Sequence, residues 1–157
     1  MTTIAANREM MVSDSKVTVE TKGITYPATK IIRVGSRIVG ASGHGGDCTR
    51  FLEWAKKDFK GSAPKWVESP TSDDCVLALI LDADGLYIYS PGDPEPEKIN
   101  ADFFAVGSGG KPARAAMKLG LDPIKAVELA CEIDDFYSGP PLQIIKLKPD
   151  ADPEAKR

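Results

Sequence analysis

The run from Cys75 to Asp82 constrains the fold of this sequence more than any other segment. Its residues, CVLALILD, are apolar on both faces of an extended strand, a pattern typical of a strand buried between two layers. Asp84-Gly85 and then Leu86–Tyr89 follow, and this order predicts a tight turn and a hairpin. The chain is therefore expected to build layers around a central sheet.

The other predicted elements form blocks of strands and blocks of helices. Gly35-Ser36 separates two β-branched segments and predicts a hairpin turn within Ile31–Gly40. Asp122 followed by Pro123 is typical of a helix start and predicts a helix to about Ile133. The remaining predicted strands are Thr3–Ala6, Met10–Val19 (interrupted by a polar triplet), Phe103–Val106 and Leu142–Leu147, and the remaining helices follow Gly46 and cover Pro112–Leu119. This order favours an α+β layered domain over repeated βαβ units.

Length and composition indicate one globular domain. The 157 residues are 42% hydrophobic and 27% charged, which is ordinary for a chain that buries a core. We interpret residues 1–148 as the domain and residues 149–157 as a charged C-terminal tail. The net charge of −3 argues against a basic nucleic-acid footprint, and no apolar run reaches the roughly 20 residues of a membrane span. The start of the chain lacks a signal-peptide pattern, so we expect the cytoplasm.

Two glycine clusters invite a ligand-binding interpretation. Gly107–Lys111 departs from the phosphate-loop motif because Pro112 follows the lysine, and Gly43–Gly46 lacks the dinucleotide-binding spacing. We interpret both as tight strand-to-helix turns, with a catalytic site of backbone N–H groups as the alternative. No CxxC pair is present, so neither a zinc site nor a disulfide framework is expected; the cysteines are Cys48, Cys75 and Cys131.

Two polar features keep two interpretations each. His44, in the first glycine cluster, is either a surface loop residue or a general base. Asp134-Asp135, near a helix end, is either a solvated acidic pair or contains a functional carboxylate.

Thr2 has chemistry only if Met1 is removed. Aminopeptidases remove a methionine that precedes a small residue such as threonine, so a free N-terminal Thr2 is the expected form. Its hydroxyl is a nucleophile, and its own amine, with a pKa near 8, can act as the general base. An ordinary Met-Thr start without catalytic meaning is the alternative.

Taken in order, these signals resemble the proteasome β-subunit family of N-terminal nucleophile hydrolases, which includes the bacterial HslV protease. The resemblance covers about residues 2–147. The matching segments are the start Met1–Ile4, Ser13–Thr18 (the family's Asp-Ser-Arg-Ala-Thr), Ala28–Ile31 (its active-site lysine), Ser42–Cys48 (its glycine/alanine turn ending in Asp-Cys), Val106–Gly109 (its Gly-Ser-Gly) and Asp135–Gly139 (its Asp-x-x-Ser-Gly).

The resemblance implies a catalytic role for each matched position. Thr2 would attack a peptide carbonyl, with its own amine, directly or through a water, taking the proton. Lys30 would stay charged beside Thr2, and Asp14 would hold Lys30 by a charge-assisted hydrogen bond. The N–H of Gly43 would form the oxyanion hole.

Further roles come from the same resemblance. It implies that Ser108, Asp135 and Ser138 orient the Thr2 amine and the water, and that Ala41 and Gly45 line a roomy first specificity pocket. Two positions depart from the family. The segment from Lys60 to Cys75 is a short loop where the family has a second helix, and His44 replaces a small residue near the proposed oxyanion donor.

The fold and activity implied by the resemblance are specific. The fold is a four-layer αββα sandwich that lacks or shortens one family helix. The activity is that of a threonine peptidase in a homo-oligomeric ring, acting on peptides or unfolded proteins without a cofactor, a nucleic acid or a membrane. An ATPase unfoldase partner and a structural monovalent or divalent cation stay open. The alternatives are a catalytically silent proteasome-like scaffold subunit and an amidase acting on a small-molecule amide.

Overall fold

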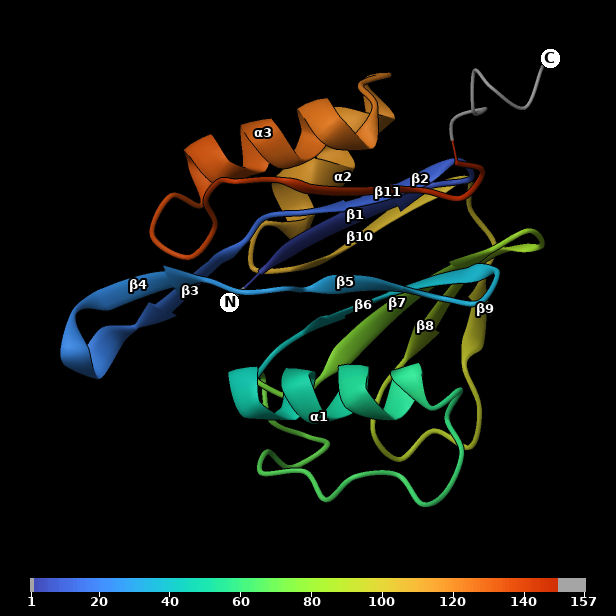
Figure 1. Cartoon of the computed structure of the whole chain (residues 1–157). Coiled ribbons are helices and arrows are strands. Elements are labelled where there is room, and N and C mark those ends of the chain that lie inside the picture. Colours follow the sequence, from blue (N-terminus) through green and yellow to red (C-terminus); the bar gives the residue numbers. More distant parts are fainter. Residues whose placement is uncertain (1, 150–157) are drawn as a thin grey trace, which may run out of the picture.

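Two antiparallel sheets lie face to face in the computed structural model, which describes residues 2–149 (Figure 1). The four-stranded sheet has the order β10-β1-β2-β11, with β1 (Thr3–Asn7), β2 (Met10–Ser13), β10 (Phe103–Gly107) and β11 (Gln143–Lys146). The five-stranded sheet has the order β5-β6-β7-β8-β9, with β5 (Ile31–Val34), β6 (Arg37–Ser42), β7 (Leu77–Asp82), β8 (Gly85–Tyr89) and β9 (Glu97–Ile99). The apolar run is thus the central strand β7, as its pattern predicts.

Helices cover the outer face of each sheet, which completes the four-layer αββα sandwich (Figure 1). Helix α1 (Gly45–Lys56) packs on the five-stranded sheet, and α2 (Gly110–Lys118) and α3 (Pro123–Ile133) pack on the four-stranded sheet. The Asp122 carboxylate accepts a hydrogen bond from the Lys125 N–H at 2.9 Å and caps α3 as predicted.

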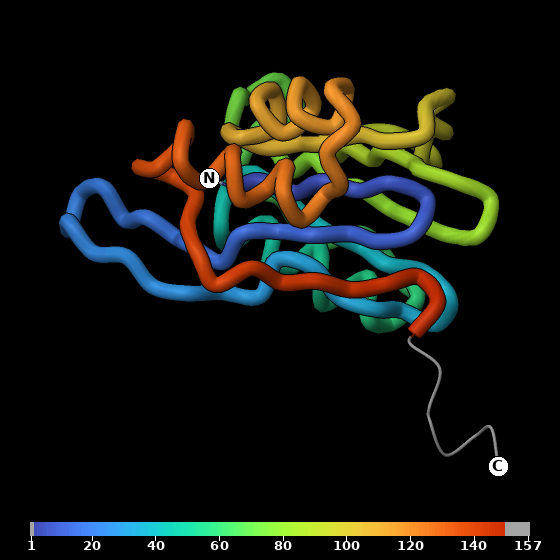
Figure 2. The backbone as a smooth tube through the Cα atoms, turned by 90° about the horizontal axis from the view of Figure 1, so that it is seen from above, coloured from blue at the N-terminus to red at the C-terminus, as the bar shows by residue number. Residues whose placement is uncertain are grey.

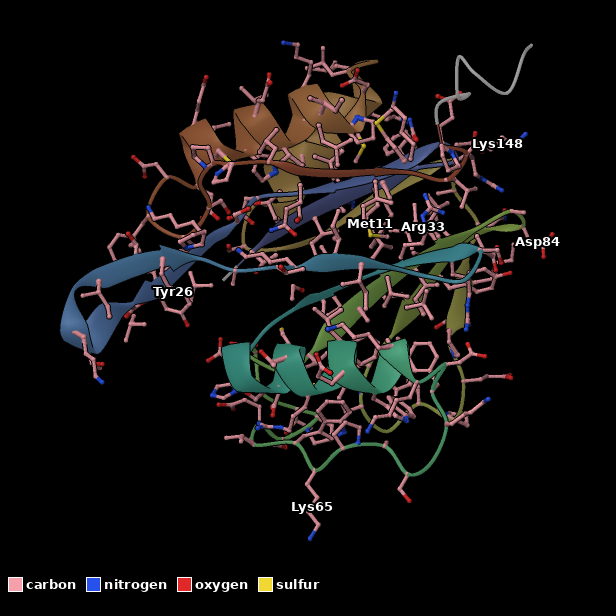
Figure 3. The ribbon with its side chains drawn as sticks, in the orientation of Figure 1. Met11, Tyr26, Arg33, Lys65, Asp84 and Lys148 are labelled. Atoms are coloured by element: carbon pink, nitrogen blue, oxygen red, sulfur yellow. The ribbon has the colours of Figure 1, made fainter. Side chains whose placement is uncertain are left out.

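Alternation along the strands builds three apolar layers. On β1, Ile4 and Ala6 face the other sheet while Ala5 faces the helices, as a period of two residues requires. Met11 is fully buried and lies between the sheets (Figure 3). The inner layer contains Ile4, Ala6, Met11, Ile31, Ile38, Leu79, Leu81, Leu86 and Val106. The layer under α1 contains Val39, Ala41, Phe51, Leu52, Ala55, Val76, Ala78, Ile80 and Tyr89.

A two-stranded ribbon extends beyond the sandwich, as both backbone views show (Figures 1 and 2). Its strands are β3 (Lys16–Val19) and β4 (Ile24–Pro27), joined by the 3-10 turn η1 (Glu20–Lys22). Pattern analysis predicts neither β4 nor β9. β4 is exposed at every position and ends in proline, and β9 has only three residues, so neither carries a buried face that alternation could reveal.

Between α1 and β7 the chain forms a loop without helix or strand, as the sequence predicts. The loop is fixed at its middle by the fully buried carboxylate of Asp47, which accepts hydrogen bonds from the N–H groups of Val67 (2.9 Å) and Glu68 (3.0 Å). The Arg50 guanidinium donates a further bond at 2.6 Å. Burial alone raises the pKa of Asp47, but these donors outweigh it and bring the pKa below its ordinary value.

Residues 150–157, most of the predicted tail, lie outside the described part of the chain, as does Met1. Within residues 2–149 no helix has the length and apolar character needed to cross a membrane.

Removing the loop anchor gives a first prediction. Asp47→Asn should lower the free energy of unfolding by about 2 kcal/mol at pH 7, because a buried charged acceptor is lost. Because the folded-state pKa is depressed, the difference from wild type should be complete above the ordinary value near 3.8 and vanish as the pH falls through the folded value. Urea unfolding at pH 7 and in acid measures both.

The matched control is Asp58→Asn, because Asp58 forms an exposed ion pair with Arg37. That change should cost at most about 1 kcal/mol. Equal losses of unfolding free energy in the two variants would show that Asp47 does not anchor the loop.

Candidate active site

Seven chain segments meet at one end of the sandwich because the strand register brings their termini together. Thr3 at the start of β1 pairs with Gly107 at the end of β10, and Ile4 pairs with Ser13 at the end of β2. In the other sheet, Ser42 at the end of β6 pairs with Leu77 at the start of β7. The residues just outside these strand ends and before β5 therefore lie around Thr2, together with Ser138 from the segment before β11. They are Asp14, Lys30, Gly43, Ser108 and Ser138, all predicted site residues.

Asp14 is the centre of the first polar network. Its carboxylate is fully buried, and the Lys30 ammonium donates to both oxygens at 2.9 and 3.1 Å. Oδ1 also accepts from the N–H of Thr3 at 2.9 Å, and Oδ2 accepts from the N–H groups of Lys16 (3.1 Å) and Gly139 (3.0 Å). Lys30 and the peptide that follows Thr2 thus share one acceptor oxygen.

Lys30 carries a charge at a site where water is largely excluded. Its side chain is 6% exposed, and Nζ also donates to the carbonyl oxygen of Lys16 at 2.6 Å. Burial lowers the pKa of Lys30 below its ordinary value, and the negative charge of Asp14 offsets part of that effect. The pair is therefore a buried ion pair in which each group depends on the other.

A second network joins Thr3 to two serines and a carboxylate. The hydroxyls of Ser108 and Ser138 each donate to Asp134 Oδ2 at 2.7 Å. Ser138 Oγ also lies 2.7 Å from Thr3 Oγ1, and because its proton points to Asp134, Thr3 is the donor in that bond. Ser108 Oγ lies 3.4 Å from the carbonyl oxygen of Thr2. Asp134 therefore organises the hydroxyls beside the start of the chain.

The structure places Asp134, rather than Asp135, at this position. Asp135 is exposed and contributes its main-chain carbonyl, which accepts from Lys16 Nζ at 2.6 Å. The acidic pair was identified from the sequence, but motif matching points to Asp135. No sequence signal separates the two aspartates. At the end of α3 the N–H groups of Tyr137 and Ser138 both donate to the Asp134 carbonyl, and this turn holds Asp134 next to Ser138.

Gly43 brings a backbone N–H to the same place. Its φ of +122° lies in the region that favours glycine, and a Cβ there would lie 2.6 Å from the carbonyl oxygen of Cys75. Within residues 2–149 no hydrogen bond from the Gly43 N–H is found. The next residue, His44, caps α1 by accepting from the Asp47 N–H at 3.3 Å, so the helix start lies directly after Gly43. Its ring thus has a structural role in the turn.

A cavity of about 470 Å³ opens beside Thr2, between the strand ends and the loop before β7. Thr2 is only 5% exposed, lines this cavity, and its hydroxyl makes no hydrogen bond to another described residue. Gly43 and Ser108 line the same cavity. Neither predicted pocket residue does so: Ala41 is buried in the layer under α1, and Gly45 is exposed at the start of that helix.

Two other chemistries find little support in the described residues. Burial raises the thiol pKa of Cys48 to about 12 and that of Cys131 to about 11, so both thiols are protonated at neutral pH. In the segment 2–149, no group of three or more His, Cys, Asp or Glu side chains is placed to hold a metal ion.

Comparison with solved structures identifies the fold. The chain is similar to HslV from Trypanosoma brucei, with 22% identity over 92% of this chain and 98% of that one, at a TM-score of 0.66. It is also similar to the BPH protein of Thiobacillus denitrificans (23% identity, 95% and 99% coverage, TM-score 0.63) and to the Anbu protein of Pseudomonas aeruginosa (13% identity, 92% and 80% coverage, TM-score 0.64). No family model and no curated protein matches the sequence. The fold is therefore that of the proteasome- and HslV-like N-terminal nucleophile hydrolases, as the sequence resemblance implies.

The contact between Gly107 and Thr2 gives a second prediction. A Cβ at Gly107 (φ +93°) would collide with the carbonyl oxygen of Thr2, whereas a Cβ at Gly92 (φ +99°) meets nothing within 4 Å. Gly92→Ala should therefore cost only the backbone strain, about 1–2 kcal/mol of unfolding free energy. Gly107→Ala should cost about 2 kcal/mol more, because a buried neighbour must move. Urea unfolding compares the two, and equal costs would show that Gly107 does not fix Thr2.

Substitutions in the acidic pair give a third prediction. Asp134→Ala should lower the free energy of unfolding by about 1–2 kcal/mol, because the Ser108 and Ser138 hydroxyls lose their charged acceptor. Asp135→Ala should stay within about 0.5 kcal/mol of wild type, since its carboxylate is exposed. A larger loss for the Asp135 variant in thermal or urea unfolding would reverse the assignment.

Proposed function

We propose that this protein is a threonine hydrolase that cleaves peptide bonds with Thr2 as its N-terminal nucleophile, after removal of Met1. The observation that carries the proposal is the position of the Thr2 hydroxyl: Thr2 lines a cavity, and its hydroxyl makes no hydrogen bond to another described residue. A hydroxyl that faces a cavity without a protein partner is available to a bound molecule, so its position there calls for a function. Attack on a bound carbonyl supplies one.

In the proposed reaction the Thr2 oxygen attacks the substrate carbonyl carbon. The free α-amine of the same residue, with an ordinary pKa near 8, takes the hydroxyl proton and passes it to the leaving amine. The acyl group then bonded to Thr2 is released by a water molecule, which the amine activates in the same way. One residue thus supplies both nucleophile and base, and Met1 must be absent because its peptide bond would block the amine.

The Asp14–Lys30 pair prepares Thr2 electrostatically. A positive charge near an amine disfavours protonation of that amine, and it also favours the negative charge that develops on the attacking oxygen. Asp14 supports both effects, because it binds Lys30 and the Thr3 N–H through one oxygen. In this scheme Asp14 is a positioning residue.

The Gly43 N–H is the proposed donor to the oxyanion. It lies at the start of α1, where backbone donors and the helix dipole favour negative charge. A donor of this kind contributes roughly 3 kcal/mol to transition-state stabilisation in other enzymes. Ser108 and Ser138, held by Asp134, orient the amine and the water. Asp135, which the sequence motif indicates for this task, has an exposed side chain and accepts a hydrogen bond from Lys16 through its main-chain carbonyl.

The finer parts of the proposal concern substrate and assembly. The substrates are peptides or unfolded protein segments, and the working form is a homo-oligomer in the cytoplasm. The structural neighbours support an assembly, because the Anbu protein has been solved as a helical assembly. The BPH protein has been solved in complex with epoxomicin, and this directs the choice of probe below. An ATPase partner is not part of the proposal.

The decisive test is the intact mass of the protein before and after reaction with a peptide epoxyketone. The protein is produced behind a cleavable leader, so that the mature chain starts at Thr2. One adduct, mapped to Thr2, is expected, because such a probe reacts with both the hydroxyl and the amine of an N-terminal threonine. Thr2→Ala should give no adduct, and peptide turnover should fall roughly 10³-fold or more.

Two controls test whether Thr2, rather than Cys75, is the nucleophile and whether turnover depends on Lys30 specifically. Cys75 lines the same cavity, so Cys75→Ser must keep the adduct. Lys30→Met should abolish turnover, while Lys22→Met, on the exposed η1 turn, should not. A mature chain that gives neither adduct nor Thr2-dependent turnover would refute the proposal and favour the silent scaffold subunit. Thr2-dependent turnover restricted to small amides would favour the amidase.

A further inference from the structure

We infer that the cavity beside Thr2 is a subsite for a positively charged substrate side chain, lysine or arginine, which Asp73 and Asp74 recognise. This inference rests on the proposed function, because it assigns a substrate class to the same site. The fold does not require acidic residues at these two positions, because Asp73 and Asp74 lie on the loop before β7.

The charged side chains that line the cavity are both acidic. Among residues 2–149, Asp73 and Asp74 are the only lining residues with charged side chains, and no lysine, arginine or histidine lines the cavity. Its volume of about 470 Å³ falls within the range of small-molecule sites. The unpartnered Thr2 hydroxyl stands in the same wall. A side chain that enters this space therefore lies next to Thr2 and to the two aspartates together.

The two carboxylates have no partner in the described chain. Neither Asp73 nor Asp74 forms an ion pair, and neither side chain accepts a hydrogen bond from residues 2–149. The other acidic groups around the site differ, because Asp14, Asp47 and Asp134 are each bonded to several donors. The carboxylates of Asp73 and Asp74 are therefore available to bind a positively charged ligand.

The backbone that carries these carboxylates is built into the site. The carbonyl oxygen of Asp74 accepts from the His44 N–H at 2.7 Å, next to the proposed oxyanion donor. Ser72 Oγ donates to Glu68 Oε2 at 2.9 Å, and the Glu68 N–H is bonded to the buried Asp47. These contacts connect the backbone of the loop that carries the two aspartates to α1.

The rest of the lining suits a long cationic side chain. Val76, Leu77 and Gly107 supply apolar surface, against which the methylene stem of a lysine or arginine can pack. The charged head then interacts with the exposed carboxylates of Asp73 and Asp74. An acidic side chain in the same place would face like charges, so the pocket should discriminate against it.

The test measures kcat/KM for quenched-fluorescence peptides that differ at one position. Arginine, the nearly isosteric but neutral citrulline, and glutamate are placed in turn at each position on either side of the cleaved bond. Arginine should exceed citrulline by about tenfold at one position, as two partly exposed ion pairs allow, and glutamate should be the poorest. Added salt should reduce the preference.

The double variant Asp73→Asn/Asp74→Asn should bring the arginine-to-citrulline ratio close to one. The matched control is Asp84→Asn/Asp102→Asn, which removes the same charge near Arg8, where the Arg8 guanidinium contacts both residues. That region lies at the Asp82 end of β7, opposite the Leu77 end beside the cavity (Figure 3). The control should keep the wild-type ratio.

Failure of this inference and failure of the proposed function give different results. Thr2-dependent turnover without a preference for arginine at any position, or with a preference that survives the double variant, overturns the subsite. Binding of the same peptides to the Thr2→Ala protein, measured by fluorescence anisotropy, gives a readout without turnover. Selective binding of arginine peptides without any turnover by wild type would keep the subsite and refute the peptidase.

Discussion

Asp14 places a negative charge inside the protein, and four segments of the chain converge to compensate it. Lys30, which precedes β5, supplies the positive charge, and the N–H groups of Thr3, Lys16 and Gly139 complete the hydrogen bonds. A buried carboxylate that lost these donors would be strongly unfavourable. The start of β1, the base of the ribbon, the start of β5 and the approach to β11 are therefore tied together at one point. Every proposed step at Thr2 depends on the geometry that this point fixes.

Local sequence signals predict much of the fold because, in these segments, the local preference and the tertiary structure favour the same element. The apolar run before Asp84 is the central strand, the Gly35 turn joins β5 to β6, and Asp122 caps α3. The missed strands β4 and β9 are held by pairing to a neighbour and have no buried face of their own. Strands of this kind form because they pair with a neighbouring strand. Their own sequence has no hydrophobic alternation from which they could be predicted.

In the candidate site, too, some residues are predictable from motifs and others depend on tertiary contacts. Thr2, Asp14, Lys30, Gly43, Ser108 and Ser138 were identified from motifs, and the strand register brings them to one end of the sandwich. The choice between Asp134 and Asp135 depends on the turn after α3, whose geometry is tertiary. The anchor at Asp47 was also hidden, because its partners are main-chain N–H groups some twenty residues away, which carry no side-chain signature.

The two ends of the chain differ in what can be attached to them. Thr2 is almost fully buried beside Gly107 and the Asp14 network, so a segment added before Thr2 would block the amine that the proposed reaction uses. β11 instead runs away from the site: Gln143 pairs with Ser13 beside it, and Lys146 pairs with Met10 at the opposite end. Affinity tags, fluorophores and surface tethers for work on this protein therefore belong after residue 149, where they leave the first residue unmodified.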